Sequence, residues 1–228
     1  MKKIYLKYLF MTFGLLVIIQ GEAQVDVIRG NTIADHLLIK QRESVMNGPD
    51  IDGTPYANDS FITGNVYTMK GIFKGVEMRQ NLVDDWIEFR EKGVIYILDP
   101  GPNIIKVEMD SLVLHTEPIY KEGKLAMGYF RILDDGKVKL LMQKSIEFKE
   151  KPPVKAYTST NIPAKFVTAA DKYFFRVDKL DVKPITNIKK MIDLFPDHHK
   201  ELTSYIKRKK VSIQEDDLLK FWMYYNKL

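Results

Sequence analysis

The stretch GNVYTMKGIFKGVEMRQNLVDDWIEF, residues 64–89, decides the fold that the sequence predicts. Along an extended chain, Val76, Met78 and Leu82 fall on one side, and Glu77 and Arg79 fall on the other. A period of two is typical of strands with one buried and one solvated face, the habit of antiparallel sheets. The stretch also poses a question, whether its charged and aromatic side chains form a site or only line the wet face of a sheet.

The same alternation continues beyond this stretch. It recurs at Ile105, Val107 and Met109, and it is longest across residues 137–149. Turn signals separate the runs: Lys70-Gly71, Lys92-Gly93, Asp99-Pro100-Gly101-Pro102, Lys121-Glu122-Gly123 and Asp135-Gly136. Strands separated by turns every 8–12 residues or so predict a β-meander that forms an open barrel or a sandwich.

After Pro184 the apolar period becomes helical. Asn187 is a capping residue for a helix over 187–195, and Pro196 suits the start of the next helix, which runs to about residue 209. Ser212 and Glu215 have the spacing of a capping box for a final helix. Strands followed by helices predict the α+β class, an antiparallel meander, open barrel or sandwich followed by a C-terminal helical segment.

These patterns divide the chain into four segments. We expect a signal peptide over 1–23, an N-terminal extension with a short helix (32–42) over 24–62, an antiparallel β domain over 63–183, and helices packed on the sheet over 184–228. Residues 24–228 are expected to form one globular unit, because about 200 residues suffice to bury an ordinary core.

The first residues predict export. Lys2, Lys3 and Lys7 precede the apolar run 9–19, and Gly21-Glu22-Ala23 has the small residues of a cleavage site after Ala23. The apolar run is too short to span about 30 Å of hydrocarbon. A retained N-terminal anchor or a buried core helix remains the alternative. The expected location is periplasmic or extracellular, with no transmembrane segment in the mature chain.

Composition excludes several kinds of site. The chain has no cysteine, so it has no disulfide, thiolate metal site, cysteine nucleophile or lipid-modified N-terminal cysteine, and we do not expect a lipoprotein. Without Lys2, Lys3, Lys7 and Glu22, the net charge falls from +5 to about +3. A nucleic-acid partner is not expected, because such proteins usually carry a clustered basic stripe.

Three polar motifs have some of the features of a site. His198 and Glu201 have helical spacing, but zinc needs further ligands and the other histidines are distant in sequence. Residues 50–53, DIDG, resemble only part of a calcium loop, and a turn is the simpler interpretation. Asp84 and Asp85 are adjacent, and adjacent carboxylates usually point apart. The sequence therefore predicts no catalytic, cofactor-binding or metal-binding residue and no cofactor.

Two surface sites were considered for binding. Lys207, Arg208, Lys209 and Lys210 form the densest charge run. Cations at a helix C-terminus are favourable by themselves, and peripheral contact with anionic lipid or polysaccharide is the functional alternative. Tyr67, Arg79 and Trp86 fall on the face opposite the main apolar row, which is the place for a ligand surface if the sheet has one, and the simpler interpretation of that face is a charged side in contact with water. Most of the other aromatic residues are expected in the core.

The run GTPYANDSFITGNVYTMKGIFKGVEMRQN (53–81), followed by DWIEF and IYILDP, resembles an uncharacterised family of exported, signal-peptide-bearing envelope proteins of Bacteroidota-type bacteria. Members of that family carry a G-x-P-Y-x-x-x-x-F-x-x-G-x-V-Y segment, then a G-V-x-x-R-x-N strand and a Lys- and Leu-rich helical tail, to which residues 187–225 are similar. The resemblance implies a Gram-negative envelope setting, and it supplies no catalytic residue.

Three functions remain open on the sequence alone. The first is a non-enzymatic binding or accessory role toward a protein, a glycan or another envelope component. The second is a hydrolase acting on envelope glycans or peptides, which would need two carboxylates to converge in a deep cleft with raised pKa values. The third is a carrier with a large apolar cavity between the sheet and the helices.

Overall fold

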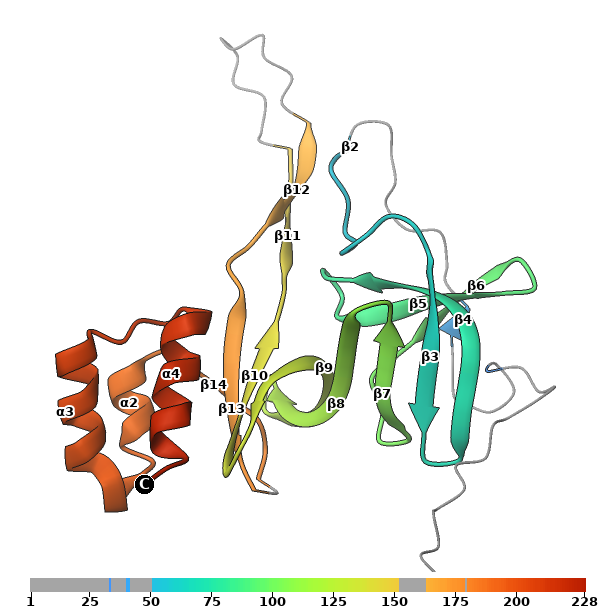
Figure 1. The fold of residues 1–228 in the computed structure, drawn as a ribbon. Coiled ribbons are helices and arrows are strands. Elements are labelled where there is room, and N and C mark those ends of the chain that lie inside the picture. Colours follow the sequence, from blue (N-terminus) through green and yellow to red (C-terminus); the bar gives the residue numbers. More distant parts are fainter. Residues whose placement is uncertain (1–32, 34–39, 42–50, 152–162, 179) are drawn as a thin grey trace, which may run out of the picture.

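The computed structural model describes residues 33, 40–41, 51–151, 163–178 and 180–228. Among these, eleven strands form one sheet in the order β1-β6-β5-β4-β3-β7-β8-β9-β10-β13-β14, with every pair of neighbours antiparallel. The sheet curls into a half-barrel, and the C-terminal helices lie beside β13 (Figure 1). The predicted α+β fold, with a meander and a helical tail, is confirmed.

The strands of the sheet are β1 Lys40–Gln41, β3 Ile62–Thr68, β4 Gly71–Asn81, β5 Trp86–Glu91, β6 Val94–Leu98, β7 Ile104–Met109, β8 Leu112–Lys121, β9 Lys124–Asp135, β10 Val138–Gln143, β13 Lys172–Val177 and β14 Lys183–Pro184. A second sheet joins β11 Ile146–Lys149, β12 Ala164–Thr168 and β2 Ile51–Asp52. Its β12–β2 pair is parallel, which the purely antiparallel expectation did not include.

Two of the predicted turns show why the meander forms. Lys92-Gly93 and Glu122-Gly123 are two-residue hairpin loops in which both residues have positive φ, between +50° and +79°. Such loops match the right-handed twist of the flanking strands, and glycine enters that conformation without steric cost. The predicted hairpin at Asp135-Gly136 is also present, since β9 and β10 pair across it.

One face of the sheet carries two hydrophobic cores. In the curled half, the core is built around Val66, Met78, Ile87, Phe89 and Val107, all of them fully buried. In the other half, β10 and β13 are covered by three helices and a short 3₁₀ turn. These elements are α2 Ile188–Ile192, η1 Pro196–His198, α3 His199–Lys209 and α4 Glu215–Tyr225.

The helices are attached through an apolar stripe on α4. Leu218, Phe221 and Trp222 are fully buried against β10 and β13, as the sequence pattern predicts. Asn226, the residue after α4, accepts a hydrogen bond from the Val138 amide and donates one to Asp134. The end of the helical tail is therefore fixed to the β9–β10 turn.

Helix caps are partly as predicted. Asn187 caps α2, accepting from the Lys190 amide at 3.1 Å, but α2 ends at Ile192, before the expected residue 195. The capping box at Ser212 is wrong. Gln214 occupies the N-cap of α4, while the Ser212 amide and hydroxyl both donate to Asp217. Asp217, two positions after Glu215, therefore accepts both hydrogen bonds through one carboxylate oxygen.

The N-terminal helix expected over 32–42 falls mostly outside the described residues. Ile33 is helical, but Lys40–Gln41 forms strand β1 on the edge of β6, which corrects that end of the helix. Pairing with an open strand edge satisfies backbone groups that a short, isolated helix leaves unpaired. The predicted break at Pro152-Pro153 also lies outside the described residues.

Two details of the predicted strands need correction. The long alternation over 137–149 is two strands, because β10 ends at Gln143 and Ile146–Lys149 pairs with β12 in the second sheet. The polar face near residues 79–88 is not wet, since Asn81 and Glu88 are fully buried. No helix of the described residues is long and apolar enough to cross a membrane.

Candidate functional site

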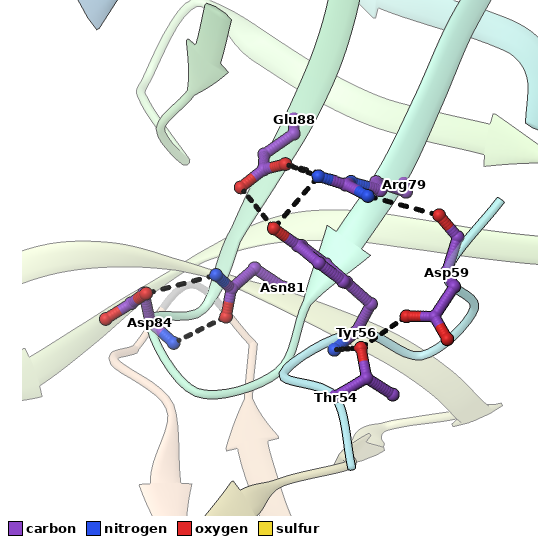
Figure 2. A network of polar contacts seen from close by, with 7 residues as sticks. All are labelled: Thr54, Tyr56, Asp59, Arg79, Asn81, Asp84 and Glu88. Atoms are coloured by element: carbon purple, nitrogen blue, oxygen red, sulfur yellow. Dashed lines mark hydrogen bonds and ion pairs between the residues drawn. The ribbon is translucent and has the colours of Figure 1, made fainter. Parts of the chain in front are cut away.

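Arg79 lies at the centre of a buried polar network that fastens residues 54–61 to the outside of β4 and β5 (Figure 2). Its guanidinium donates to Glu88 Oε2 from Nε at 2.9 Å and from Nη2 at 2.8 Å. It also donates to the Tyr56 hydroxyl at 2.9 Å and to the Asp59 carbonyl at 3.1 Å. Tyr56 in turn donates to Glu88 Oε1 at 3.2 Å.

Aromatic rings seal this network from water. The Arg79 guanidinium lies 3.7 Å from the centroid of the Tyr56 ring and 4.6 Å from that of Phe61. The side chains of Arg79 and Glu88 are 13 % and 0 % exposed. An arginine that contacts one carboxylate oxygen with two of its nitrogens and stacks on an aromatic ring is engaged inside the protein. Arg79, one of the three residues of the expected ligand surface, therefore lies in a contact that holds the fold together.

Tyr67, the second expected residue, lies on β3 in a separate cluster. Its hydroxyl donates to Glu108 at 2.6 Å, and Lys106 lies over its ring and pairs with the same carboxylate. The hydrogen bond to Glu108 raises the pKa of the Tyr67 hydroxyl, while Lys106 lowers the pKa of Glu108. The cluster is more than a quarter exposed at both charged side chains.

Trp86, the third, opens β5 opposite Asn81. Its indole N–H is buried and has no hydrogen-bond partner among the described residues. The register places Trp86 and Arg79 on one face of β4–β5, since Asn81 and Arg79 are two positions apart. Within the described part of the chain, no hydrogen bond or ion pair joins Tyr67, Arg79 and Trp86 to one another, and each belongs to a different local environment.

The other polar motifs also resolve into local contacts. His199 lies 3.1 Å from Asp193, and the ring of His198 packs edge-on against Tyr225. Asp52 belongs to the two-residue strand β2, and Gly53 follows it with φ +79°. Within the residues that the structure describes, no group of three or more histidine or carboxylate side chains is arranged to hold a metal ion.

The charge run on α3 is exposed, as expected for a solvated helix end. Lys207, Arg208 and Lys209 occupy the last turn, and Lys210 closes the helix in the left-handed conformation, with φ +52°. The position suits the negative end of the helix dipole. Contact of these four cations with an anionic surface remains a prediction.

A shallow hollow forms where three loops and strand ends meet on the curled half of the sheet. We call it the acidic hollow. Its volume is about 580 Å³, and it is lined by Asp84, Asp85, Asp99, Pro100, Pro102, Lys121, Leu125, Ala126 and Met127. The floor is apolar and the rim carries three aspartates and one lysine. The sequence shows that Asp84 and Asp85 are adjacent. It does not show that the β6–β7 and β8–β9 loops lie beside them.

Asp85 is the most constrained carboxyl of the acidic hollow. It accepts hydrogen bonds from Lys121 Nζ at 2.7 Å and from Gln143 Nε2 at 3.2 Å, and its side chain is 24 % exposed. Burial raises the pKa of the Asp85 carboxyl, and Lys121 opposes that rise. Its φ of +57° is a hairpin conformation shared with Lys92 and Glu122, so it indicates a turn and not functional strain.

Asp84 and Asp85 are each held by other side chains. Asp85 is engaged with Lys121 and Gln143, and Asp84 accepts from the buried Asn81 side-chain amide at 3.1 Å. A shallow hollow in which Asp84 and Asp85 are already hydrogen-bonded differs from the deep cleft with two raised pKa values that the hydrolase alternative leads us to expect. The geometry offers charge and apolar surface for binding.

Exposed apolar side chains extend the floor of the acidic hollow. Leu125 is 61 % exposed, and Tyr120, its direct partner across the β8–β9 hairpin, is 57 % exposed. Both stand next to Lys121, which holds Asp85. Apolar area rimmed by charge is the usual composition of a protein-binding surface. No sequence signal marks this patch, because both residues also fit the apolar pattern of the strands.

No family model, curated protein or solved structure matches this chain. The resemblance to exported envelope proteins therefore stays a prediction, and so do export and the envelope setting.

Proposed function

We propose that the chain is an exported, non-enzymatic binding protein of the cell envelope, and that the acidic hollow receives a basic and apolar segment of a partner protein. The observation that carries the proposal is the exposed pair Tyr120 and Leu125 beside a rim that includes Asp84 and Asp99. Both aspartates are exposed, so a cation on the partner can reach them while its apolar side chains cover the floor.

The rest of the sheet favours this location over the other polar regions. Arg79 and Glu88 bind each other, and Tyr56 also binds Glu88, so neither charged side chain is available to a partner. Glu117 is likewise paired with Arg176 from β13. By contrast, Leu125 is mostly solvent-exposed, so covering it with a partner gains about 25 cal/mol for each Å² of apolar surface removed from water.

The first test is an in-cell cross-linking pull-down of the tagged chain in its native host, read by mass spectrometry. Wild type, Leu125→Lys and Met69→Lys are compared. Met69 is 70 % exposed in the β3–β4 turn, outside the acidic hollow, so both variants add one positive charge at an exposed apolar position. We expect one recurrent envelope partner with wild type and Met69→Lys, and loss of that partner with Leu125→Lys.

A second measurement asks for the chemistry of the partner directly. The purified chain is titrated with a peptide of alternating lysine and leucine and, separately, with one of alternating glutamate and leucine. Binding of the basic peptide alone, weakened by salt and by Leu125→Lys, supports the proposal, because exposed charges are screened by ions. Equal binding of both peptides, or a pull-down unchanged by Leu125→Lys, would refute it.

The hydrolase alternative depends on one observation, the raised pKa of Asp85. If Asp85 were an acid or base, Asp85→Asn would abolish release of product from envelope glycans or peptides while leaving the fold intact. Hydrolysis by wild type that Asp85→Asn loses would replace the binding proposal with the enzymatic one.

A further inference from the structure

A small cavity lies at the seam between the two hydrophobic cores, apart from the acidic hollow. Its volume is about 220 Å³, and we call it the seam cavity. It is lined by Ala57, Gln80, Leu112, Leu114, Tyr129, Arg131, Met142, Gln143 and Lys144. Leu114 and Tyr129 belong to the core of the curled half, and Met142 belongs to the core under the helices.

The register explains why these residues meet. Met142 pairs with Arg131 across β9 and β10, so the two side chains share one face, and Tyr129 is on that face too. Tyr129 is fully buried and donates from its hydroxyl to the Leu98 carbonyl, across the curled sheet. The inner part of the seam cavity is thus apolar, rigid and already satisfied in its hydrogen bonds.

The mouth of the seam cavity has the opposite character. Arg131 and Lys144 are exposed there, and neither side chain makes a hydrogen bond or ion pair with another residue that the structure describes. By contrast, three other cations of this sheet are paired: Arg79 with Glu88, Lys106 with Glu108, and Arg176 with Glu117. Two unpaired cations above an apolar cavity are the arrangement that binds an anion with an apolar body.

We propose that the seam cavity binds a small amphipathic carboxylate, with its apolar part against Leu114 and Met142 and its carboxylate between Arg131 and Lys144. Arginine pairs with carboxylates through two parallel hydrogen bonds, and lysine adds a point charge. The volume is below the range of about 300–1,000 Å³ that is usual for drug-sized ligands, so the ligand is a short chain or a single ring. Gln80 also lines the cavity and supplies a neutral hydrogen-bonding group, whereas the side-chain amide of Gln143 already donates to Asp85 and to the Tyr129 carbonyl.

The test is isothermal titration calorimetry of the purified chain with octanoate, phenylacetate and the neutral analogue octanol. The double variant Arg131→Gln/Lys144→Gln removes both cations. The control, Lys149→Gln/Arg208→Gln, makes the same charge change at exposed positions outside the seam cavity. Both variants change only exposed side chains, and circular dichroism with thermal unfolding verifies that each is folded.

We expect at least one of the two carboxylates to bind in preference to octanol, and the double variant to bind it at least about tenfold more weakly, since hydrogen bonds to charged groups contribute about 1.5–3 kcal/mol. The control is expected to bind like wild type. Filling the cavity with Leu112→Trp should also abolish binding. Absence of binding by both carboxylates, equal binding of octanol, or equal weakening in the control would each overturn the proposal. None of these results depends on the acidic hollow, so they are separable from the test of the proposed function.

Discussion

Two clusters on the outer face of the sheet have the same three components and different surroundings. In one, Tyr56 and Arg79 bind Glu88, and in the other, Tyr67 and Lys106 bind Glu108. In both, the tyrosine hydroxyl donates to the carboxylate and the cation lies over the tyrosine ring, at 3.7 Å for Arg79 and 4.3 Å for Lys106. We call them the buried triad and the exposed triad.

The difference between the two triads is burial. Glu88 is 0 % exposed, whereas Glu108 is 27 % exposed. A carboxylate in water can lose its cation and be solvated instead, but a buried one cannot. The same three kinds of side chain thus stabilise the fold in the buried triad and form a weak surface contact in the exposed triad. Residue type and spacing alone therefore do not indicate a site.

The largest effect is expected from Arg79→Met. This change leaves the Glu88 carboxylate buried without its cation, and breaking a buried pair typically costs about 3–5 kcal/mol. Urea unfolding of the purified chain measures the loss of free energy of unfolding. A loss below about 1 kcal/mol would mean that the two triads do not differ as described.

Gly64→Ala tests the pairing of β3 with β7. Only the exposed triad depends on this pairing, because Tyr67 lies on β3 and Glu108 on β7. A Cβ at Gly64 would lie 1.9 Å from the Glu108 carbonyl oxygen, so β3 and β7 must separate. Overpacking of this kind typically costs about 1–3 kcal/mol, and a clash with backbone belongs at the upper end. Hydrogen exchange should show increased exchange in β3 and β7. Unchanged exchange there would contradict the close approach.

Lys106→Met should have a small effect. Glu108 keeps the hydrogen bond from Tyr67 and remains in contact with water, so we expect a loss of about 0.2–1 kcal/mol. High salt should shrink this difference, because exposed charges are screened. Urea unfolding of wild type and variant at low and high salt measures both. A loss as large as that of Arg79→Met would remove the contrast between the triads.

Asp85→Asn should change the stability of the fold only slightly. The change should be smallest at acid pH and grow toward neutral pH. The folded-state pKa of Asp85 lies above its ordinary value, so the folded chain holds the proton more tightly than the unfolded chain. Its contribution to stability therefore falls as the pH rises from about 4 through the folded-state pKa. Asparagine does not titrate, and it tolerates the positive φ of this position.

Thermal unfolding at pH 4 and pH 7 measures this effect. The variant should gain in Tm relative to wild type as the pH rises across that window. A relative gain toward acid pH would mean that the contact with Lys121 outweighs burial. It would also place Asp85 among the ordinary ion pairs of the surface.

Much of the fold follows from local signals. The period-two alternation, the Lys92-Gly93 and Glu122-Gly123 loops and the Asn187 cap all depend on neighbours within a few residues, and the structure confirms them. The parallel pairing of β2 with β12 joins residues more than a hundred positions apart, and no local signal encodes it.

The candidate sites were less predictable for the same reason. Arg79 fits the wet face of a strand, and only the return of residues 54–61 over β4 buries it. The acidic hollow combines the β4–β5, β6–β7 and β8–β9 loops, and the seam cavity combines four strands. Sequence shows which residues can bind. The curl of the sheet determines which of them meet.

The attachment of α4 has a consequence for how the protein is made. Trp222 completes the core over β10 and β13. Asn226 forms hydrogen bonds with the turn between β9 and β10, although it lies about ninety residues later in the chain. A ribosome delivers the chain from its N-terminus, so the strands are made before the helices, and the apolar face of β10 and β13 stays uncovered until the tail follows. During this interval the uncovered apolar face of the nascent chain can associate with other chains.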